Sequence, residues 1–345
     1  MANDDNGRIK DGHQMLLRLA GRLPDENMTR CREQLAGGAA ADMAREIVSF
    51  VLSDGVPLAS EDVAVLTALL EEADDDTSVL TDVEVDDSDP LLWNFRSFVA
   101  EDATSTMDLE RVVSRTLAAE ADAIGCWRAW RIWPEDEMPE TAKAVFVVEV
   151  SADADAVGVT ARLQEQLAAA GEDSPQVEVW CRNAELPTYQ RLARGSGELI
   201  WAAAEDPGMQ LARVFDEVDP EDGPSFSPDH PRLPEDEADR VAQYLRAGEP
   251  VLVTSARMDD VVDAAQRYCV PLNFRTDGLW VWTEASAYYA EQYNLQPDPG
   301  LLAHIRSKDY QVPDVDGVEL HRALAVLQKP PETESVWTFG SGPEQ

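Results

Sequence analysis

The chain has 345 residues, and its 67 acidic residues against 28 Lys and Arg give a formal net charge of −39. This length predicts two or three domains, and the 44% of hydrophobic residues can build real cores, so the charge does not indicate wholesale disorder. Sequence-independent binding to nucleic acid needs clustered Lys and Arg, and so does binding to an anionic membrane surface. We therefore expect neither nucleic acid nor membrane as a direct partner.

The sequence shows no motif for a cofactor, a metal or a catalytic nucleophile. The spacings typical of zinc peptidases, serine hydrolases, phosphate-binding loops and dinucleotide-binding folds are absent. The acidic N-terminus is unlike a secretion signal, and no run of about 18 apolar residues indicates a membrane span, so a cytoplasmic location is expected. We predict no cofactor, no metal and no catalytic residues. The four cysteines are expected to be buried thiols: Cys31, Cys126, Cys181 and Cys269.

Residues 1–90 are predicted to form an acidic helical domain. Apolar residues recur there at spacings of three and four, which is typical of amphipathic helices. Ser60, followed by Glu61 and Asp62, is predicted to cap one of these helices. The three apolar groups are Met15, Leu16, Leu19 and Leu23; Met43, Ile47, Val48, Val51 and Leu52; and Val63, Leu66, Leu69 and Leu70.

The acidity is concentrated in one stretch of this domain. From Glu33 to Phe95 there are sixteen acidic residues and a single basic one, Arg45. A solvated surface or adaptation to high salt explains such a bias, and so does a docking surface, because a localised negative field steers a cationic partner. The residues that we expect to bind a basic protein are Asp74, Asp75, Asp76, Asp82, Glu84, Asp86, Asp87 and Asp89.

A linker over residues 91–106, with Trp93, Phe95 and Phe98 docked on a neighbour, is predicted to lead into an α+β domain over residues 107–205. The expected order is helix, strand, strand, helix, strand, helix, strand, with the helices on one face of a mainly antiparallel sheet. The expected elements cover 108–121, 124–133, 144–150, 157–169, 176–181, 187–194 and 198–203.

Three segments of this domain resemble a known family. They are Cys126-Trp127-Arg128-Ala129-Trp130, the strand from Val145 to Val150, and Val177-Glu178-Val179. Over about a hundred residues, 107–205, the chain resembles the C-terminal α/β domain of the bacterial enhanced-serine-sensitivity protein B family. This resemblance implies an α/β fold and no catalytic residues.

Residues 206–237 hold six prolines and are predicted to be an irregular connector. A second α/β unit over 238–329, in the style of actinobacterial proteins, and a tail over 330–345 complete the chain. The strongest turn signal is Asp277-Gly278, which predicts a hairpin. The whole is thus predicted to be α+β, a helical bundle followed by two α/β units with antiparallel or mixed sheets. In the second unit we expect helices at 238–246, 259–268, 286–293, 299–307 and 318–327, and strands at 250–253, 272–274 and 279–282.

Trp127, Trp130 and Trp133 alternate with Arg128 and Arg131, as in platforms that stack single-stranded nucleic acid. On a strand, however, alternation places Trp130 on one face and the other two tryptophans on the opposite face. The three rings therefore cannot form one stacking surface, and we interpret them as structural aromatics.

A second cluster surrounds the predicted hairpin. Trp280 and Trp282 share one strand face, and Arg275 lies on the opposite arm. An arginine beside two tryptophans can anchor a carboxylate ligand or a partner's aromatic residue, whereas a core-facing pair is the alternative interpretation.

Our leading hypothesis is a non-catalytic, cytosolic protein-binding protein. Its acidic surface would capture a basic protein, as an immunity or antitoxin-like neutraliser captures a toxin. The alternatives are an enzyme or ligand-binding domain that uses Arg275, Trp280 and Trp282, and a structural or assembly component.

Overall fold

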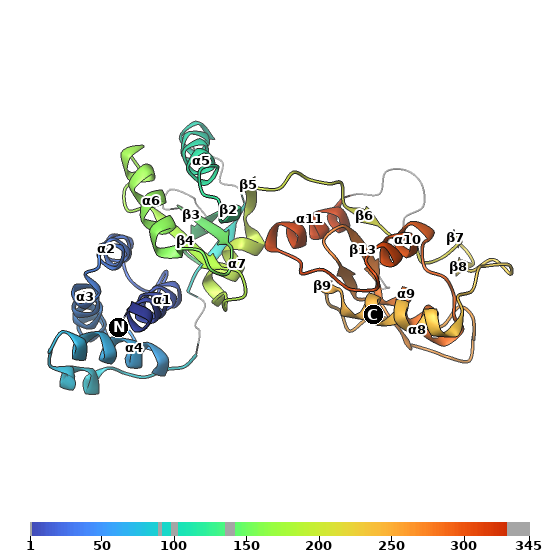
Figure 1. Cartoon of the computed structure of the whole chain (residues 1–345), viewed down its shortest axis with the longest axis horizontal. Coiled ribbons are helices and arrows are strands. Elements are labelled where there is room, and N and C mark those ends of the chain that lie inside the picture. The colour runs from blue at the N-terminus through green and yellow to red at the C-terminus, as the bar shows by residue number, and fades with distance from the viewer. Residues whose placement is uncertain (1, 89–91, 98–102, 135–141, 330–345) are drawn as a thin grey trace. The chain divides into compact units, whose positions relative to one another are not determined.

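A computed structural model describes residues 2–88, 92–97, 103–134 and 142–329. The chain forms two compact units, unit 1 (Met1–Ala204) and unit 2 (Glu205–Gln345) (Figure 1). Helices precede mixed sheets, so the protein has the predicted α+β class. The composition suggested a separation at residues 91–106, but this segment lies inside unit 1, where it contributes a strand to the sheet.

Unit 1 begins with a helical layer of four α-helices and one 3-10 helix. The apolar residues expected from the spacing lie in or against its core, except Leu52, which is 39% exposed; Met15, Leu16, Met43, Ile47 and Leu66 are fully buried. Gly55 ends the third helix in the left-handed region (φ 65°), where glycine carries no steric penalty. The elements are α1 (Ala2–Arg18), α2 (Asp25–Ala36), α3 (Ala40–Asp54), α4 (Ser60–Glu72) and η1 (Thr77–Asp82).

The predicted cap of α4 is wrong. Ala59 occupies the N-cap position, and Ser60 is the first residue of the helix. The backbone N–H of Ser60 donates to Asp87 Oδ1 at 2.7 Å, and its hydroxyl donates to Asp87 Oδ2 at 3.0 Å. A carboxylate 27 residues away therefore caps this helix, a long-range contact that local sequence patterns do not reveal.

The sheet of unit 1 has the order β1-β2-β3-β4, with β5 also paired to β2. Within the described residues, β3 and β4 pair in parallel, and the other pairs of this sheet are antiparallel. The predicted strands match these closely. The bounds are β1 (Asn94–Arg96), β2 (Ala123–Ile132), β3 (Lys143–Val150), β4 (Gln176–Cys181) and β5 (Glu198–Ala202).

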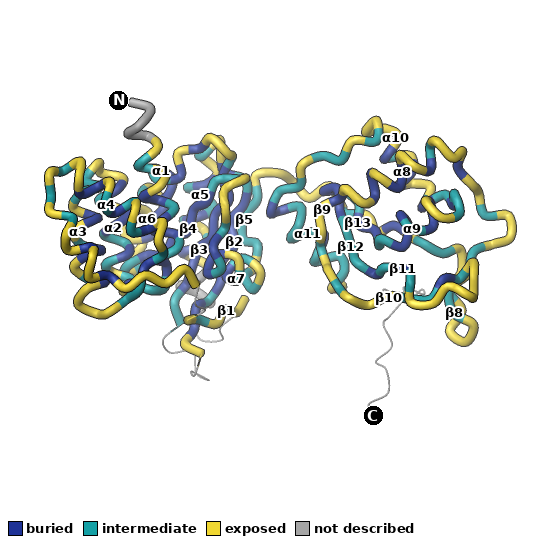
Figure 2. Tube along the Cα trace, turned by 90° about the horizontal axis from the view of Figure 1, so that it is seen from below, coloured by how far each residue is buried: buried dark blue, intermediate teal, exposed yellow. Residues whose placement is uncertain are grey.

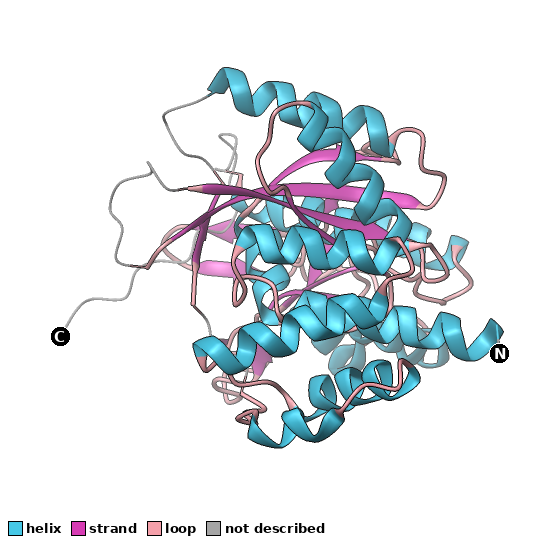
Figure 3. Cartoon of the chain, turned by 90° about the vertical axis from the view of Figure 1, so that its left-hand side faces the viewer, coloured by secondary structure: helices cyan, strands magenta, loops and turns pink. Residues whose placement is uncertain are grey.

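Helices cover both faces of this sheet, so the expectation of helices on one face is wrong (Figure 3). One face packs Cys126, Phe146 and Val179 against α5 (Ala103–Leu117) and α6 (Ala156–Ala169) in an apolar core. The opposite face is covered by α7 (Thr188–Ser196) and by the helical layer. Strands β2, β3 and β4 are therefore buried almost throughout (Figure 2), which explains their largely apolar sequences.

Unit 2 is built on a sheet of order β6-β13-β12-β9. The predicted hairpin is confirmed: β12 and β13 pair in antiparallel register around Gly278, whose φ is 90°. The connector contributes short strands, although its prolines led us to expect none. The strands are β6 (Gln210–Leu211), β7 (Glu217–Asp219), β8 (Gly223–Ser225), β9 (Glu249–Leu252), β10 (Arg257–Met258), β11 (Val270–Pro271), β12 (Phe274–Thr276) and β13 (Trp280–Thr283).

Four helices pack on this sheet: α8 (Glu235–Ala247), α9 (Glu284–Tyr293), α10 (Pro299–Ser307) and α11 (Gly317–Gln328). The predicted helix over 259–268 is wrong. Asp260 accepts a backbone hydrogen bond from Val262, Asp263 accepts one from Ala265, and the two turns take the place of helical hydrogen bonds. The predicted tail, 330–345, lies outside the described residues.

Candidate functional site

The predicted acidic surface follows the end of α4. Asp74, Asp76, Asp82, Glu84, Asp86 and Asp87 are exposed, and Asp75 is half-buried. Asp89 lies outside the described residues. The segment is held against the bundle by a bridge between Leu58 and Val85, in which the Leu58 N–H donates to the Glu84 carbonyl at 2.9 Å. We use "acidic surface" below for the seven described residues, 74–76, 82, 84, 86 and 87.

Several of these carboxylates also stabilise the local backbone. Asp76 caps η1 by accepting the N–H of Ser78 at 2.9 Å, and Asp86 accepts the N–H of Ser88 at the same distance. The N–H of Ser78 lowers the pKa of Asp76 below the ordinary value, and the hydroxyl of Ser88, which donates to Asp86 Oδ2 at 2.7 Å, lowers that of Asp86 together with the Ser88 N–H. Asp75 accepts from Arg45 Nε at 2.7 Å. The segment is therefore ordered by its own acidic groups.

Three members of the acidic surface point to solvent without an internal role. The described residues offer no hydrogen bond or ion pair to the side chains of Asp74, Asp82 and Glu84. Two apolar side chains lie in the same segment and are unusually exposed, Val79 at 38% and Val85 at 53%. The rim of a protein–protein interface is polar, so exposed carboxylates beside two apolar side chains are compatible with an interface.

Elsewhere in the helical layer, acidic side chains are neutralised by arginines from the first two helices. Arg30 pairs with Glu46, with Nε 2.9 Å from both carboxylate oxygens, and Arg18 Nε lies 2.8 Å from Oδ1 of the buried Asp62. Arg8 pairs with Glu72. The bias seen in the sequence therefore leaves its uncompensated charge mainly on the acidic surface.

Arg275, Trp280 and Trp282 do not form an accessible anchor. Trp282 is fully buried, and its indole N–H donates to the Leu245 carbonyl at 2.9 Å. Trp280 is half-buried and packs on the same core, so the predicted shared face is confirmed as a core face. The guanidinium of Arg275 is engaged by Glu284, with Nε 2.5 Å from Oε1. The ligand-anchor interpretation is therefore wrong for Trp282, which is inaccessible. Arg275 is also not free to bind a ligand, because Glu284 already pairs with it.

The tryptophans of β2 alternate as predicted. Trp127 is buried beside Trp180, with ring centroids 5.9 Å apart, whereas Trp130 packs on the core of the other sheet face. Trp133 follows the strand and stacks on Trp93 at 4.3 Å. Trp93 and Phe95 thus dock on unit 1 as expected, while Phe98 lies outside the described residues.

Two polar clusters of unit 2 were missed by the sequence reasoning. Asp277 accepts the Tyr244 hydroxyl at 2.6 Å, and His304 Nε2 lies 2.9 Å from the same oxygen, so Asp277 links the hairpin to α8 and α10. Asp260 accepts the hydroxyls of Tyr288 at 3.0 Å and Tyr293 at 2.5 Å. The second contact, together with burial, raises the pKa of Tyr293 to about 12. Both carboxylates organise irregular backbone.

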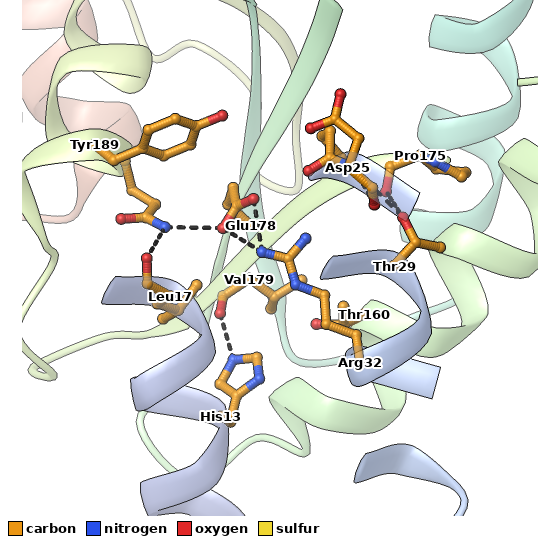
Figure 4. A network of polar contacts seen from close by, with 12 residues as sticks. His13, Leu17, Asp25, Thr29, Arg32, Thr160, Pro175, Glu178, Val179 and Tyr189 are labelled. Atoms are coloured by element: carbon orange, nitrogen blue, oxygen red, sulfur yellow. Dashed lines mark hydrogen bonds and ion pairs between the residues drawn. The ribbon is translucent and has the colours of Figure 1, made fainter. Parts of the chain in front are cut away.

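A third missed cluster is buried in unit 1. Arg32 Nη2 lies 2.7 Å from both carboxylate oxygens of Glu178, and Gln190 donates to Glu178 at 2.8 Å (Figure 4). One signal was visible in the sequence: Glu178 stands between Val177 and Val179 in a strand, where a charge needs a partner.

The described residues contain no group of three or more His, Cys, Asp and Glu side chains arranged to hold a metal ion. Nor does the described part of the chain include a helix with the length and apolar character needed to cross a bilayer. No protein-family model matches the sequence, and no curated protein and no solved structure is significantly similar to it. The resemblance of residues 107–205 to the enhanced-serine-sensitivity protein B family stays a prediction.

Proposed function

We propose that this chain is a non-catalytic protein-binding protein whose acidic surface captures a basic protein, in the manner of an immunity or antitoxin-like protein that neutralises a toxin. The observation that carries the proposal is the segment from Asp74 to Asp87, where six of the seven carboxylates of the acidic surface are exposed and no Lys or Arg interrupts them.

The arrangement of this segment supports a docking role over simple solvation. Charges needed only for solubility can sit on mobile side chains, whereas Asp76, Asp86 and Asp87 are fixed by backbone hydrogen bonds. A fixed negative field steers a cationic partner and speeds its association. The exposed Val79 and Val85 add apolar area, which gives an encounter complex short-range contacts after the charges have aligned it.

Charge reversal tests the proposal. Asp82→Lys with Glu84→Lys alters two exposed carboxylates that have no internal contact, so the fold should be unaffected. The matched control is Asp153→Lys with Glu165→Lys, two exposed acidic residues elsewhere in unit 1 that give the same net charge. Each tagged chain is expressed in the native cell, and proteins recovered with it at low salt are identified.

A basic protein is expected with the native chain and with the control, and its recovery should fall with salt because the attraction is screened. The variant Asp82→Lys with Glu84→Lys should no longer recover the basic protein. Equal recovery with both variants would place the interface elsewhere. Recovery of no basic protein at either salt concentration would contradict the proposed function.

A further inference from the structure

Among the described residues of unit 1, two hydrophobic clusters lie on either side of the junction between the helical layer and the sheet layer. One is formed within the helical layer by residues such as Met28, Ile47 and Leu66. The other lies between the sheet and α5 and α6, with Phe146 and Leu163 at its centre. Val157 of α6 also packs against the helical core, but the two buried clusters share no residue. The helical layer and the sheet are thus distinct packing units within one compact body.

Polar contacts also cross the junction between these clusters, beside the packing of α1 and α2 on α6, and we call these polar contacts the polar seam. Helices α1 and α2 contribute His13, Asp25, Thr29 and Arg32, and the sheet layer contributes Arg131, Gln176, Glu178 and Gln190. In Figure 4, His13 and Arg32 reach toward β4 from two neighbouring helices. His13 Nε2 lies 2.7 Å from the Val179 carbonyl, and Gln190 donates to the Leu17 carbonyl at 2.8 Å.

The seam is deeply buried yet incompletely satisfied. Arg32 is 2% exposed and Glu178 is fully buried. Among the described atoms, Arg32 Nη1, Gln176 Oε1 and Gln190 Oε1 have no hydrogen-bond partner. A buried ion pair gains little over apolar packing, because desolvation of both charges offsets most of their attraction. The ion pair of the seam therefore adds little net stability to the junction.

His13 is the group in the seam that can change charge near neutral pH. The Val179 carbonyl only accepts, so Nε2 carries a proton, and the ring changes charge by binding a second proton at Nδ1. The charged groups that face it are Arg32 of α2, Glu178 of β4 and Asp155, which caps α6. Burial lowers the pKa of His13 below 6.5, and the positive charge of Arg32 acts in the same direction. The Val179 hydrogen bond, Glu178 and Asp155 act in the opposite direction but do not outweigh burial.

We propose that the polar seam is an acid-sensitive joint, at which protonation of His13 releases the helical layer from the sheet while both hydrophobic cores stay folded. The docked state excludes a proton that the open state binds, so acidification favours opening. The joint would let the protein change shape in response to pH without unfolding.

The size of the effect follows from linkage. With an ordinary pKa of 6.5 for the exposed imidazole and a docked state that does not bind the proton, the opening constant rises about tenfold between about pH 7.5 and about pH 5.5. Exposed Asp and Glu keep their charge across most of this window, because their ordinary pKa values lie near 4.

Two indole protons provide the reporter and its control. Trp93 lies beside β1, and its N–H donates across the seam to the Gly21 carbonyl at 2.7 Å. The Trp282 N–H is buried in unit 2. Hydrogen exchange of both protons is measured by NMR on the full chain at the two pH values and corrected for the intrinsic rate. Exchange at Trp93 should accelerate about tenfold on acidification, with no change at Trp282.

His13→Gln is the decisive variant, since an amide can donate to the Val179 carbonyl but cannot take up a proton in this range. It should keep Trp93 exchange independent of pH. The proposal is overturned if the native chain shows no acceleration, if both indoles accelerate together, or if the acceleration persists in the variant. If His13→Gln opens the seam at every pH, the ring protons of His13 in the native chain are followed by NMR instead, and a His13 titration that does not coincide with the acceleration at Trp93 overturns the proposal.

Discussion

Replacing Glu178 by Gln should destabilise unit 1 strongly, although the two side chains have the same shape. The substitution leaves the guanidinium of Arg32, which is 2% exposed, without a counter-charge. Removing one partner of a buried pair costs about 3–5 kcal/mol. The surface pair of Arg162 and Glu120 offers a control at similar geometry, with Nε 2.6 Å from Oε1 and an arginine that is 46% exposed. There, Glu120→Gln should cost at most about 1 kcal/mol.

The double variant Arg32→Met with Glu178→Leu removes both charges, and its cost should be well below the sum of the single substitutions. Urea unfolding of the whole chain, followed by circular dichroism and tryptophan fluorescence, measures all five variants, including Arg32→Met and Glu178→Leu alone. The transition of unit 2 serves as an internal reference. If the costs of Arg32→Met and Glu178→Leu simply add, the pair is not coupled and our account of the seam fails.

Two further predictions concern the cores. Gly248→Ala would place a Cβ 2.4 Å from Trp282 Cζ2, so we expect the free energy of unfolding to fall by about 1–3 kcal/mol. Thermal unfolding measures this loss, and Gly195→Ala, whose Cβ would meet no atom within 4 Å, is the control that should show none. Burial raises the pKa of the Cys31 thiol to about 12 and that of Cys126 further. Both thiols should therefore resist alkylation at about pH 8 until the chain unfolds, which mass spectrometry of labelled peptides can follow; rapid labelling of either in the folded chain would contradict their burial.

The elements that follow a local rule were predictable from the sequence. Strand β4 and helix α10 have the predicted bounds, because an apolar run and an Asp-Pro start specify them locally. The segment 259–268 failed for a physical reason, since its aspartates bind nearby N–H groups and compete with helix formation.

The contacts between distant segments were not predictable. Asp87 caps a helix that begins 27 residues earlier, and Arg32 pairs with a strand residue 146 positions later. Sequence periodicity reveals which face of an element is apolar but not which element covers it. For the same reason, the sequence could not decide whether Trp282 faces the core or a ligand, because it does not show that α8 packs over this face of the hairpin.

The position of β4 at the end of the sheet has a consequence for how this protein can be divided. Its free side is covered by side chains of α1 and α2, including His13 on the Val179 carbonyl, and no strand among the residues that the structure describes pairs with it there. A fragment beginning near residue 107 would expose the free edge of β4, which could then pair with another copy. It would also leave the carboxylate of Glu178 without Arg32, its partner in the whole chain. The α+β layer should therefore not be stable as an independent fragment. Expressed alone or fused to another protein, it should aggregate unless residues 7–88 are present as well.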